Sequence, residues 1–188
     1  MKISIVAACA LATLGLSAFA QAYVGIGVGT SHATAACISG EGHCGDDAPA
    51  EKLLGGWALP GTDFAIEGAY SHLGTFRQTL LQGDLDDRVD TFGVGGAWRP
   101  QFGAGWGGVA RLGVGYSSVK TSSFEEFFGE FASGSYKKTS WHPTVGVGAT
   151  YAVSPKIRLE ADFDYARPMA PQGRVSTDAF TLGATFGF

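Results

Sequence analysis

Two histidines stand close to serines in this sequence, and a histidine beside a serine is the pair from which a nucleophile and its general base are built. His72 directly follows Ser71, whereas Ser140 and His142 are two residues apart. In an extended strand neighbouring side chains point to opposite faces, so only Ser140 and His142 could act together, with a carboxylate from the acidic residues described next. No recognisable catalytic motif surrounds either pair. We therefore predict that the protein has no catalytic residue and is not an enzyme.

Seven charged side chains fall on the same face of their segments as glycines and other small residues. They are Lys52, Glu67, Arg111, Arg158, Glu160, Asp162 and Asp164. If these segments are strands of one closed barrel, the seven side chains line its lumen, where mixed charges should pair and fill a narrow interior. The alternative is that the pairs open as a gate for ions. No metal site and no cofactor are expected.

The cysteines point to an oxidising compartment. Cys9 lies in the apolar N-terminal run and is interpreted as part of it. Cys37 and Cys44 stand close together in a glycine-rich acidic stretch, and in an exported protein such thiols oxidise, so we predict a disulfide between them. A zinc ion held by Cys37, His43 and Cys44 is the alternative, but no fourth ligand stands at a recognisable spacing.

The N-terminus has the parts of a secretory signal peptide. Lys2 supplies the positive charge, residues 3–16 the apolar run, and small residues around Ala20 the cleavage site. The apolar run is shorter than the roughly 20 residues that a membrane-spanning helix needs. We predict a signal peptide over residues 1–22, a mature chain that starts at Gln21 or Tyr23, and one domain over residues 23–188.

Apolar and small residues alternate with a period of two along eight later segments, and none is apolar for long enough to span a membrane as a helix. The segments are 23–30, about 51–59, about 63–72, 91–98, 106–116, 141–151, 157–165 and 180–188. Short links lie at 60–63, 99–103 and 153–156, and longer polar segments at about 31–50, 73–88, 118–139 and 167–177. Short turns at one end and long loops at the other are typical of membrane barrels. The predicted fold is all-β, an eight-stranded antiparallel up-and-down transmembrane β-barrel.

Threading these strands up and down gathers aromatic residues at two levels, as expected at the two membrane interfaces. The periplasmic level holds Trp57, Phe64, Trp98, Trp106, Tyr151 and Phe188. The outer level holds Tyr70, Tyr116, Trp141, Tyr165 and Phe180. A soluble barrel would instead turn its apolar face inward, so the two girdles favour a membrane barrel.

The polar segment 118–139 contains four phenylalanines among acidic residues. They are Phe124, Phe127, Phe128 and Phe131. Exposed aromatic residues often mark a binding surface, so this segment is a candidate for binding a host or other surface ligand. The alternative is that the flanking strands extend as a hairpin whose phenylalanines pack on neighbouring loops. The formal net charge of −4 argues against nucleic acid as a partner.

Three parts of the chain resemble the small outer-membrane barrels related to the transmembrane domain of OmpA and the broad outer membrane protein β-barrel domain family. YVGIGVG at 23–29 is similar to the first strand of that family, KLLGGW at 52–57 with FAIEGAY at 64–70 to the second and third, and TLGATFGF at 181–188 to the last. The resemblance implies contact with outer-membrane lipids, including lipopolysaccharide. It also implies that the barrel-assembly machinery reads the C-terminal strand ending in Phe188. Some such barrels modify lipid A, which keeps a lesser enzymatic alternative open.

The sequence as a whole thus predicts a non-enzymatic, integral protein of the bacterial outer membrane with a side-chain-filled lumen. Its expected role is to contribute to envelope integrity and to present surface loops for adhesion or host interaction. The main alternative is a narrow porin-like channel for ions or small solutes.

Overall fold

The computed structural model describes residues 21–34, 43–44, 47–80, 83–127, 130–170 and 173–188, and all regular structure within them is β. The strands are β1 (Gln21–Thr34), β2 (His43–Cys44), β3 (Asp47–Ala58), β4 (Phe64–Leu80), β5 (Gly83–Trp98), β6 (Gln101–Gly103), β7 (Trp106–Phe127), β8 (Glu130–Ala152), β9 (Ile157–Ala166), β10 (Met169–Ala170), β11 (Gly173–Arg174) and β12 (Ser176–Gly187). No helix in this described part of the chain is long and apolar enough to cross a membrane.

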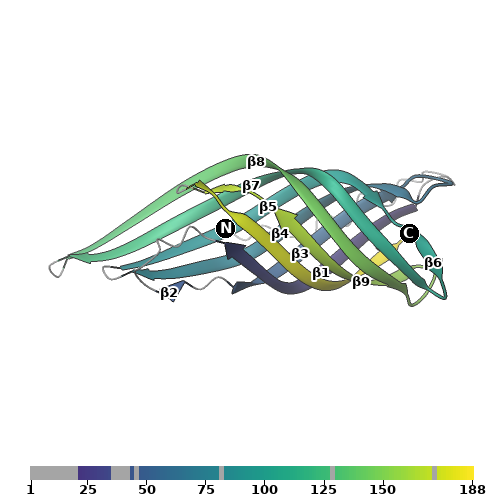
Figure 1. Cartoon of the computed structure of the whole chain (residues 1–188), viewed down its shortest axis with the longest axis horizontal. Helices are drawn as coiled ribbons and strands as arrows, with labels where there is room; N and C mark the ends of the chain where they lie inside the picture. The colour runs from purple at the N-terminus through teal and green to yellow at the C-terminus, as the bar shows by residue number, and fades with distance from the viewer. Residues whose placement is uncertain (1–20, 35–42, 45–46, 81–82, 128–129, 171–172) are drawn as a thin grey trace.

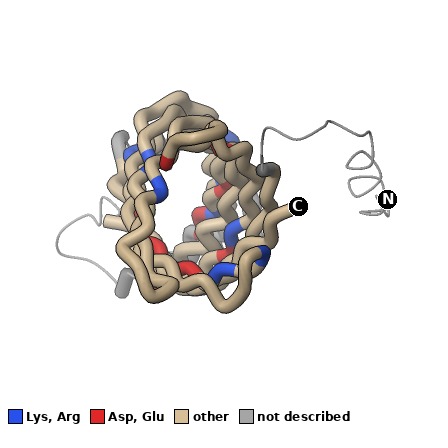
Figure 2. The backbone as a smooth tube through the Cα atoms, turned by 90° about the vertical axis from the view of Figure 1, so that its right-hand side faces the viewer, with Lys and Arg blue, Asp and Glu red and all other residues tan. Residues whose placement is uncertain are grey.

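Eight long strands form a closed antiparallel barrel, β1, β3, β4, β5, β7, β8, β9 and β12, in which each strand pairs with the next (Figure 1). β1 pairs with β12 from Tyr23 opposite Gly187 to Thr34 opposite Ser176, and this pairing closes the ring (Figure 2). The predicted eight-stranded up-and-down barrel is confirmed. Closure leaves no long unpaired strand edge, which is what lets a sheet stand in an apolar solvent.

The two ends of the barrel differ. At the short-turn end, tight connections join β3 to β4, β5 to β7 and β8 to β9; Gly61 and Gly105 there adopt φ of 71° and 83°. At the long-hairpin end, β4 pairs with β5 out to Leu80 opposite Gly83, and β7 with β8 out to Phe127 opposite Glu130. The β7–β8 hairpin projects farthest (Figure 1).

Where the structure describes the predicted long loops, much of their length is paired strand, and for 118–139 this is the extended hairpin that was the alternative. Most of 73–88 belongs to β4 and β5, and most of 118–139 to β7 and β8. In these segments the backbone pairing continues but the apolar residues now point inward, so the alternation seen in the lower part changes phase and no longer predicts a strand. Both ends of the predicted loop at 31–50 are likewise strand, since β1 runs to Thr34 and β3 begins at Asp47.

The two faces of the barrel exchange character along its length. Up to Phe92, Tyr116 and Trp141, outward side chains are apolar and exposed, and we call this surface the apolar band. Farther along the same strands outward positions are polar, for example Arg88 and Lys120. There the interior is apolar instead, and we call this buried group the inner plug: Ala33, Ala48, Ala50, Leu73, Phe76, Val89, Val119 and Ala179. The barrel therefore has a membrane-type lower part and a soluble-type upper part.

A bulge in β4 marks this transition. The register of β4 against β5 shifts between His72 and Thr75, and Gly74 adopts φ of 81°. A Cβ atom added at Gly74 would lie 2.6 Å from the Ala48 Cβ and 2.6 Å from the Pro49 carbonyl oxygen. Glycine is therefore required both by the backbone conformation and by the close approach of β3.

Candidate functional site

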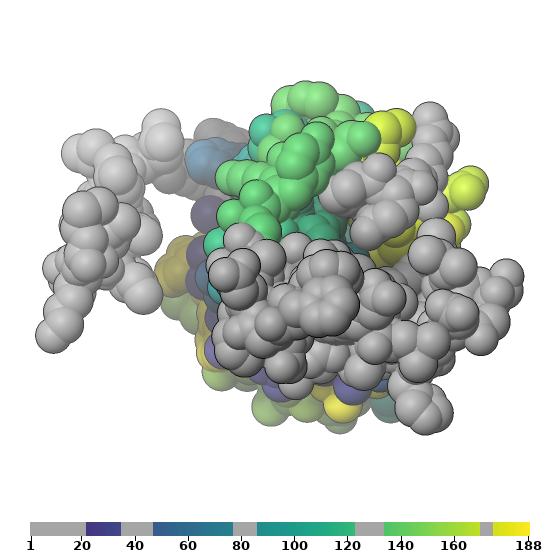
Figure 3. Space-filling model, turned by 90° about the vertical axis from the view of Figure 1, so that its left-hand side faces the viewer, coloured from purple at the N-terminus to yellow at the C-terminus, as the bar shows by residue number. Residues whose placement is uncertain are grey.

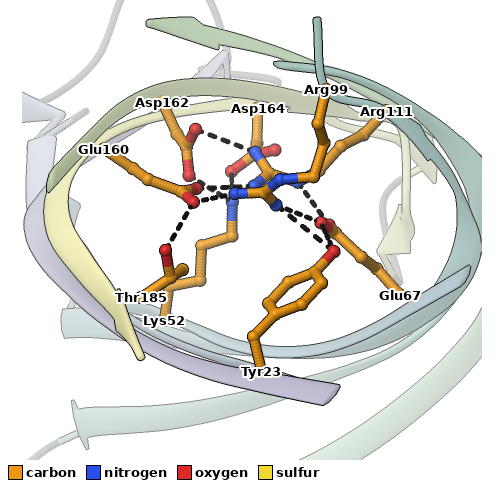
Figure 4. A network of polar contacts seen from close by, with 9 residues as sticks. All are labelled: Tyr23, Lys52, Glu67, Arg99, Arg111, Glu160, Asp162, Asp164 and Thr185. Atoms are coloured by element: carbon orange, nitrogen blue, oxygen red, sulfur yellow. Dashed lines mark hydrogen bonds and ion pairs between the residues drawn. The ribbon is translucent and has the colours of Figure 1, made fainter. Parts of the chain in front are cut away.

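The most conspicuous polar group in the molecule lies inside the barrel, at the level of the apolar band. We call it the charged cluster. Its members are Lys52 on β3, Glu67 on β4, Arg99 just after β5, Arg111 on β7, and Glu160, Asp162 and Asp164 on β9. All of these side chains point into the lumen, where Tyr23 of β1 and Thr185 of β12 join them (Figure 4). Alternation places them there, because each stands next to an outward-facing apolar residue in the sequence.

Arg111 is the centre of the cluster. Its Nε donates to Glu67 Oε2 at 2.6 Å, its Nη1 to Asp162 Oδ1 at 2.8 Å and its Nη2 to Glu160 Oε2 at 2.9 Å. Every nitrogen of one guanidinium thus meets a carboxylate from another direction, which is the planar fork geometry that arginine offers and lysine does not. The contacts tie β7 to β4 on one side of the lumen and to β9 on the other.

Arg99 bridges two of the same carboxylates, pairing with both Glu67 and Glu160. Its guanidinium carbon also lies 4.7 Å from the centre of the Tyr23 ring, within the range of a cation–π contact. The Tyr23 hydroxyl donates to Glu67 Oε1 at 2.6 Å, and the Thr185 hydroxyl donates to Glu160 Oε1 at 3.0 Å. These neutral donors use carboxylate lone pairs that the arginines leave.

Lys52 pairs with the two aspartates of the cluster, Asp162 and Asp164. Its Nζ lies 3.0 Å from Asp162 Oδ2 and 2.5 Å from Asp164 Oδ2, and its side chain is 5% exposed. Three cations and four carboxylates give the cluster a formal charge of 3 − 4 = −1. Among the described residues, no buried side-chain nitrogen or oxygen lacks a hydrogen-bond partner. Such a satisfied network is what buried charges require.

Glycines on β8 make room for these acids. A Cβ added at Gly146 would overlap Asp164 Oδ1, and one added at Gly148 would overlap Asp162 Oδ1. The carboxylates of β9 therefore lie against the bare backbone of β8. The missing side chains of these two glycines leave the space into which the cluster packs.

The structure brings together six of the seven charges that the sequence placed in the lumen. Arg158, the seventh, also points inward, but among the described residues its side chain makes none of the cluster's ion pairs and instead lines a pocket at the short-turn end. Sequence reasoning missed Arg99, Tyr23 and Thr185. Alternation also predicts that Arg99 points inward, because it directly follows the outward-facing Trp98. The turn signal at 99–103 led instead to its assignment to a loop.

Ser140 and His142, the serine and histidine that strand geometry would allow to act together, hydrogen-bond to different partners. The Ser140 hydroxyl accepts a hydrogen bond from the Met169 amide, whereas His142 Nε2 lies 2.6 Å from the Ser117 hydroxyl. Ser117 is completely buried and also contacts the Thr91 hydroxyl at 2.6 Å. The other ring nitrogen of His142 faces the Pro143 carbonyl oxygen at 3.2 Å, so a backbone carbonyl orients the imidazole. Pairing across strands, rather than spacing within one, decides which hydroxyl the histidine meets.

His72 lies on the outer wall instead. Its Nδ1 is 2.8 Å from Asp90 Oδ1, which also accepts a hydrogen bond from the Tyr70 hydroxyl at 2.8 Å. The side chain of Ser71 points to the inside of the barrel, where it lines a cavity described below. The two neighbours therefore face opposite ways, as strand geometry requires.

A cavity of about 100 Å³ separates the charged cluster from the upper part of the lumen. Lys52, Glu67, Arg111 and Asp164 form its charged side, while Leu73 and Ala179 of the inner plug lie at its apolar side. From the short-turn end upward, the lumen thus holds the charged cluster, this cavity, the Thr91–Ser117–His142 group and the inner plug. Figure 3 views the molecule from the long-hairpin end, where the green residues of β8 rise above the rest of the described surface.

The aromatic residues of the two predicted girdles lie on the outer wall. At the short-turn end Trp106 stands opposite Tyr151 with ring centres 5.0 Å apart, and Phe64 stands opposite Trp98. Near the upper edge of the apolar band Tyr116 and Trp141 have ring centres 5.0 Å apart. The other predicted members are exposed as well: Trp57, Tyr70, Tyr165, Phe180 and Phe188.

Two further predictions fall outside the described residues. The side chains of Cys37 and Cys44 are not described, so neither the disulfide nor the zinc alternative is tested. For Phe124, Phe127 and Phe131 only the strand backbone is described, and Phe128 lies outside the described residues altogether.

Comparison with known proteins gives a family match over nearly the whole chain. The model described as "Outer membrane protein beta-barrel domain" matches residues 6–188. No curated protein sequence matches significantly.

Several solved structures share the fold. Ail, the attachment invasion locus protein of Yersinia pestis, is 17% identical with a TM-score of 0.60, covering 91% of this chain and 100% of Ail. A second Ail structure, in complex with the heparin analogue sucrose octasulfate, is 18% identical with a TM-score of 0.58 over the same shares. A major outer membrane protein from Thermus thermophilus is 13% identical with a TM-score of 0.63, covering 90% of this chain and 99% of that protein.

Proposed function

Because this chain belongs to the family of outer membrane protein β-barrel domains, which places it in the bacterial outer membrane, we propose that it is a closed, non-enzymatic barrel. In this proposal it contributes to envelope integrity and presents its long hairpins at the cell surface. The short-turn end faces the periplasm, as short turns do in such barrels. The observation that carries the proposal is the charged cluster, whose ion pairs join opposite walls of the lumen.

A closed lumen predicts the absence of steady conductance. The purified barrel is expected to give no stable current steps in planar bilayers, because an ion would have to displace Arg111 from its three carboxylates and then pass the inner plug. A protein with a verified heat-modifiable gel shift that nevertheless conducts steadily would establish the channel alternative. The cavity of about 100 Å³ above the cluster is the observation in favour of that alternative.

The non-enzymatic part of the proposal rests on the surroundings of His142. Its serine partner, Ser117, is completely buried and so cannot reach a substrate. We expect lipid A mass spectra from cells that express the protein and from cells that express His142→Ala to be identical. A modification that appears with the native protein and disappears with His142→Ala would make the protein a lipid A-modifying enzyme.

Surface binding is assigned to the β7–β8 hairpin, which extends farthest from the apolar band (Figure 1). Ail, which shares this fold, has been solved with a heparin analogue. Residues 122–133 of this chain carry three glutamates and no cation, so a polyanion is not the ligand expected at this hairpin, and cultured host cells are the surface to test first. Whole cells expressing the protein should attach, and deletion of residues 122–133 should abolish attachment. Attachment that survives the deletion would remove the hairpin from this role. Deleting residues 171–172 from another connection at the same end serves as the control.

Two partners complete the proposal. Outer-leaflet lipids, including lipopolysaccharide, surround the apolar band. The barrel-assembly machinery recognises the last strand, β12, which leads to Phe188. Phe188→Ala should slow insertion, and the refolded barrel should lose only the contact of this side chain with the membrane interface, because the variant keeps the hydrogen bond from the amide of residue 188 to the Ala22 carbonyl oxygen.

A further inference from the structure

Two neighbouring strands, β7 and β8, carry a layered arrangement of outward side chains just beyond the apolar band. The first layer is the aromatic pair Tyr116 and Trp141, directly opposite each other. The next outward pair is Ser118 opposite Thr139, and the one after that is Lys120 opposite Lys137. Aromatic, hydroxyl and ammonium groups therefore follow one another within about 13 Å along the strands.

The cation layer is unusual because like charges face each other. Residues directly opposite in an antiparallel pair have Cβ atoms about 5 Å apart, and like charges at that distance destabilise the sheet. On its other side Lys120 faces Arg88 of β5, so three cations stand side by side on three strands. Among the described residues, neither lysine forms a salt bridge, and Arg88 contacts Asp90 at 3.3 Å. Both lysine side chains are exposed.

We propose that Lys120 and Lys137, with the hydroxyls of Ser118 and Thr139, form a binding site for a phosphate group of an outer-leaflet glycolipid. This inference rests on the membrane placement given above. The site faces sideways from the barrel wall, next to the aromatic residues that mark the membrane interface, and not upward from the hairpin tip. A lipid beside the wall meets it in that orientation. Its acyl chains would lie on the apolar band, its sugar at the hydroxyl layer and its phosphate between the two ammonium groups.

The charges on the neighbouring strand define the limits of the site. Asp90 lies opposite Ser118 and would repel a phosphate, but its carboxylate is held by Arg88, Tyr70 and His72. Hydrogen bonds from Tyr70 and His72, together with the Arg88 charge, outweigh burial and lower the pKa of Asp90, so it stays ionised. The anion is therefore expected on the β7–β8 side, away from Asp90.

The test uses the full barrel in phosphatidylcholine nanodiscs, titrated with bis-phosphorylated lipid A or with dephosphorylated lipid A. Native mass spectrometry gives the affinity. The double variant Lys120→Gln/Lys137→Gln should bind phosphorylated lipid A roughly thirtyfold more weakly, taking about one kcal/mol for each lysine near an anionic surface. The native protein should prefer phosphorylated lipid A by a similar factor, and raising the salt concentration should weaken that preference.

The matched control is Lys138→Gln/Lys156→Gln, which removes the same charge from an inward position beside the site and from the short-turn end. Its affinity should equal that of the native protein. Equal effects of the two double variants, or equal binding of the two forms of lipid A, would overturn the site. A heparin fragment that binds without lipid A and depends on Lys120 and Lys137 would reassign it to a sulfated glycan and overturn the lipid assignment.

Failure of the site is distinguishable from failure of the proposed function. Bilayer conductance and whole-cell attachment are measured on the same two double variants, and neither depends on Lys120 or Lys137 in the proposal above. A heat-modifiable gel shift of each variant shows that the barrel has folded.

Discussion

Arg111→Met is the sharpest test of the charged cluster, because this substitution keeps a long side chain and removes only the guanidinium. Arg111 is 12% exposed and contacts Glu67, Asp162 and Glu160 at 2.6, 2.8 and 2.9 Å. Without it the formal charge of the cluster falls from −1 to −2, and three carboxylates lose a shared partner. Removing one member of a buried ion pair costs about 3–5 kcal/mol, so the free energy of unfolding should fall by about that amount.

The measurement is reversible urea unfolding of the barrel in phosphatidylcholine vesicles, followed by tryptophan fluorescence. Lys156→Met, an exposed substitution at the short-turn end, is the control and should change the unfolding free energy by less than about 0.5 kcal/mol. The double variant Arg111→Met/Glu67→Gln should recover part of the loss, because it returns the formal charge of the cluster to −1 while Arg99 keeps Glu160 as its partner. The reasoning is refuted if Arg111→Met is no more destabilising than the control.

Three further predictions concern other parts of the lumen and the β4 bulge. Ser117→Ala should lower the unfolding free energy by about 2 kcal/mol, because it removes the buried hydroxyl that His142 and Thr91 contact. Ser140→Ala, which removes one acceptor of a backbone amide, should lower it by under about 1 kcal/mol. Equal urea midpoints of the two variants would contradict this. Gly74→Ala should lower the unfolding free energy by roughly 3 kcal/mol, through the φ of 81° at this position and the contact of the added Cβ with Ala48. Gly61→Ala, where nothing lies within 4 Å of the added Cβ, should lower it by about 1 kcal/mol. A loss at Gly74 no larger than at Gly61 would show that β3 moves to make room for the methyl group. Burial raises the pKa of Asp87, which lies above the apolar band, so the folded state binds this proton more tightly than the unfolded state does. The resulting contribution to stability is present below the unfolded pKa of Asp87 and is lost as pH rises through its folded pKa. Asp87→Asn should therefore be more stable than the native protein at pH 7 but not at pH 3. The opposite order of urea midpoints would exclude burial as the cause.

The membrane-type lower part of the barrel could be predicted from sequence because each residue there obeys one local rule. Val24, Ile26 and Val28 face lipid, and Gly25 and Gly27 face the lumen, so a period of two is visible in the letters themselves. The lumen charges followed from the same rule, since a charge in phase with the glycines points inward. Arg99 escaped only because it stands beside a turn.

The upper part could not be predicted in this way. Val89 and Val119 are buried in the inner plug, while Asp90 and Lys120 next to them face outward, which is the reverse of the pattern below. Around the transition, polar residues occupy both inward and outward positions, so the alternation is interrupted. The sequence pattern therefore indicates that the strands end there. Only the register of β4, β5, β7 and β8 shows that the backbone pairing continues.

The sequence by itself determined the class of the protein, the number of long strands and which side chains of the lower part face inward, because all three depend on alternation along one strand. The tertiary structure decided which of these side chains meet across strands, inside the lumen and on the outer wall. It joined Arg111 to acids on two other strands, gave His142 the hydroxyl of Ser117 in place of that of Ser140, and set Lys120 beside Lys137 and Arg88. These meetings depend on the register between strands, which is fixed by packing and turn geometry across the whole barrel and leaves no mark in any one segment.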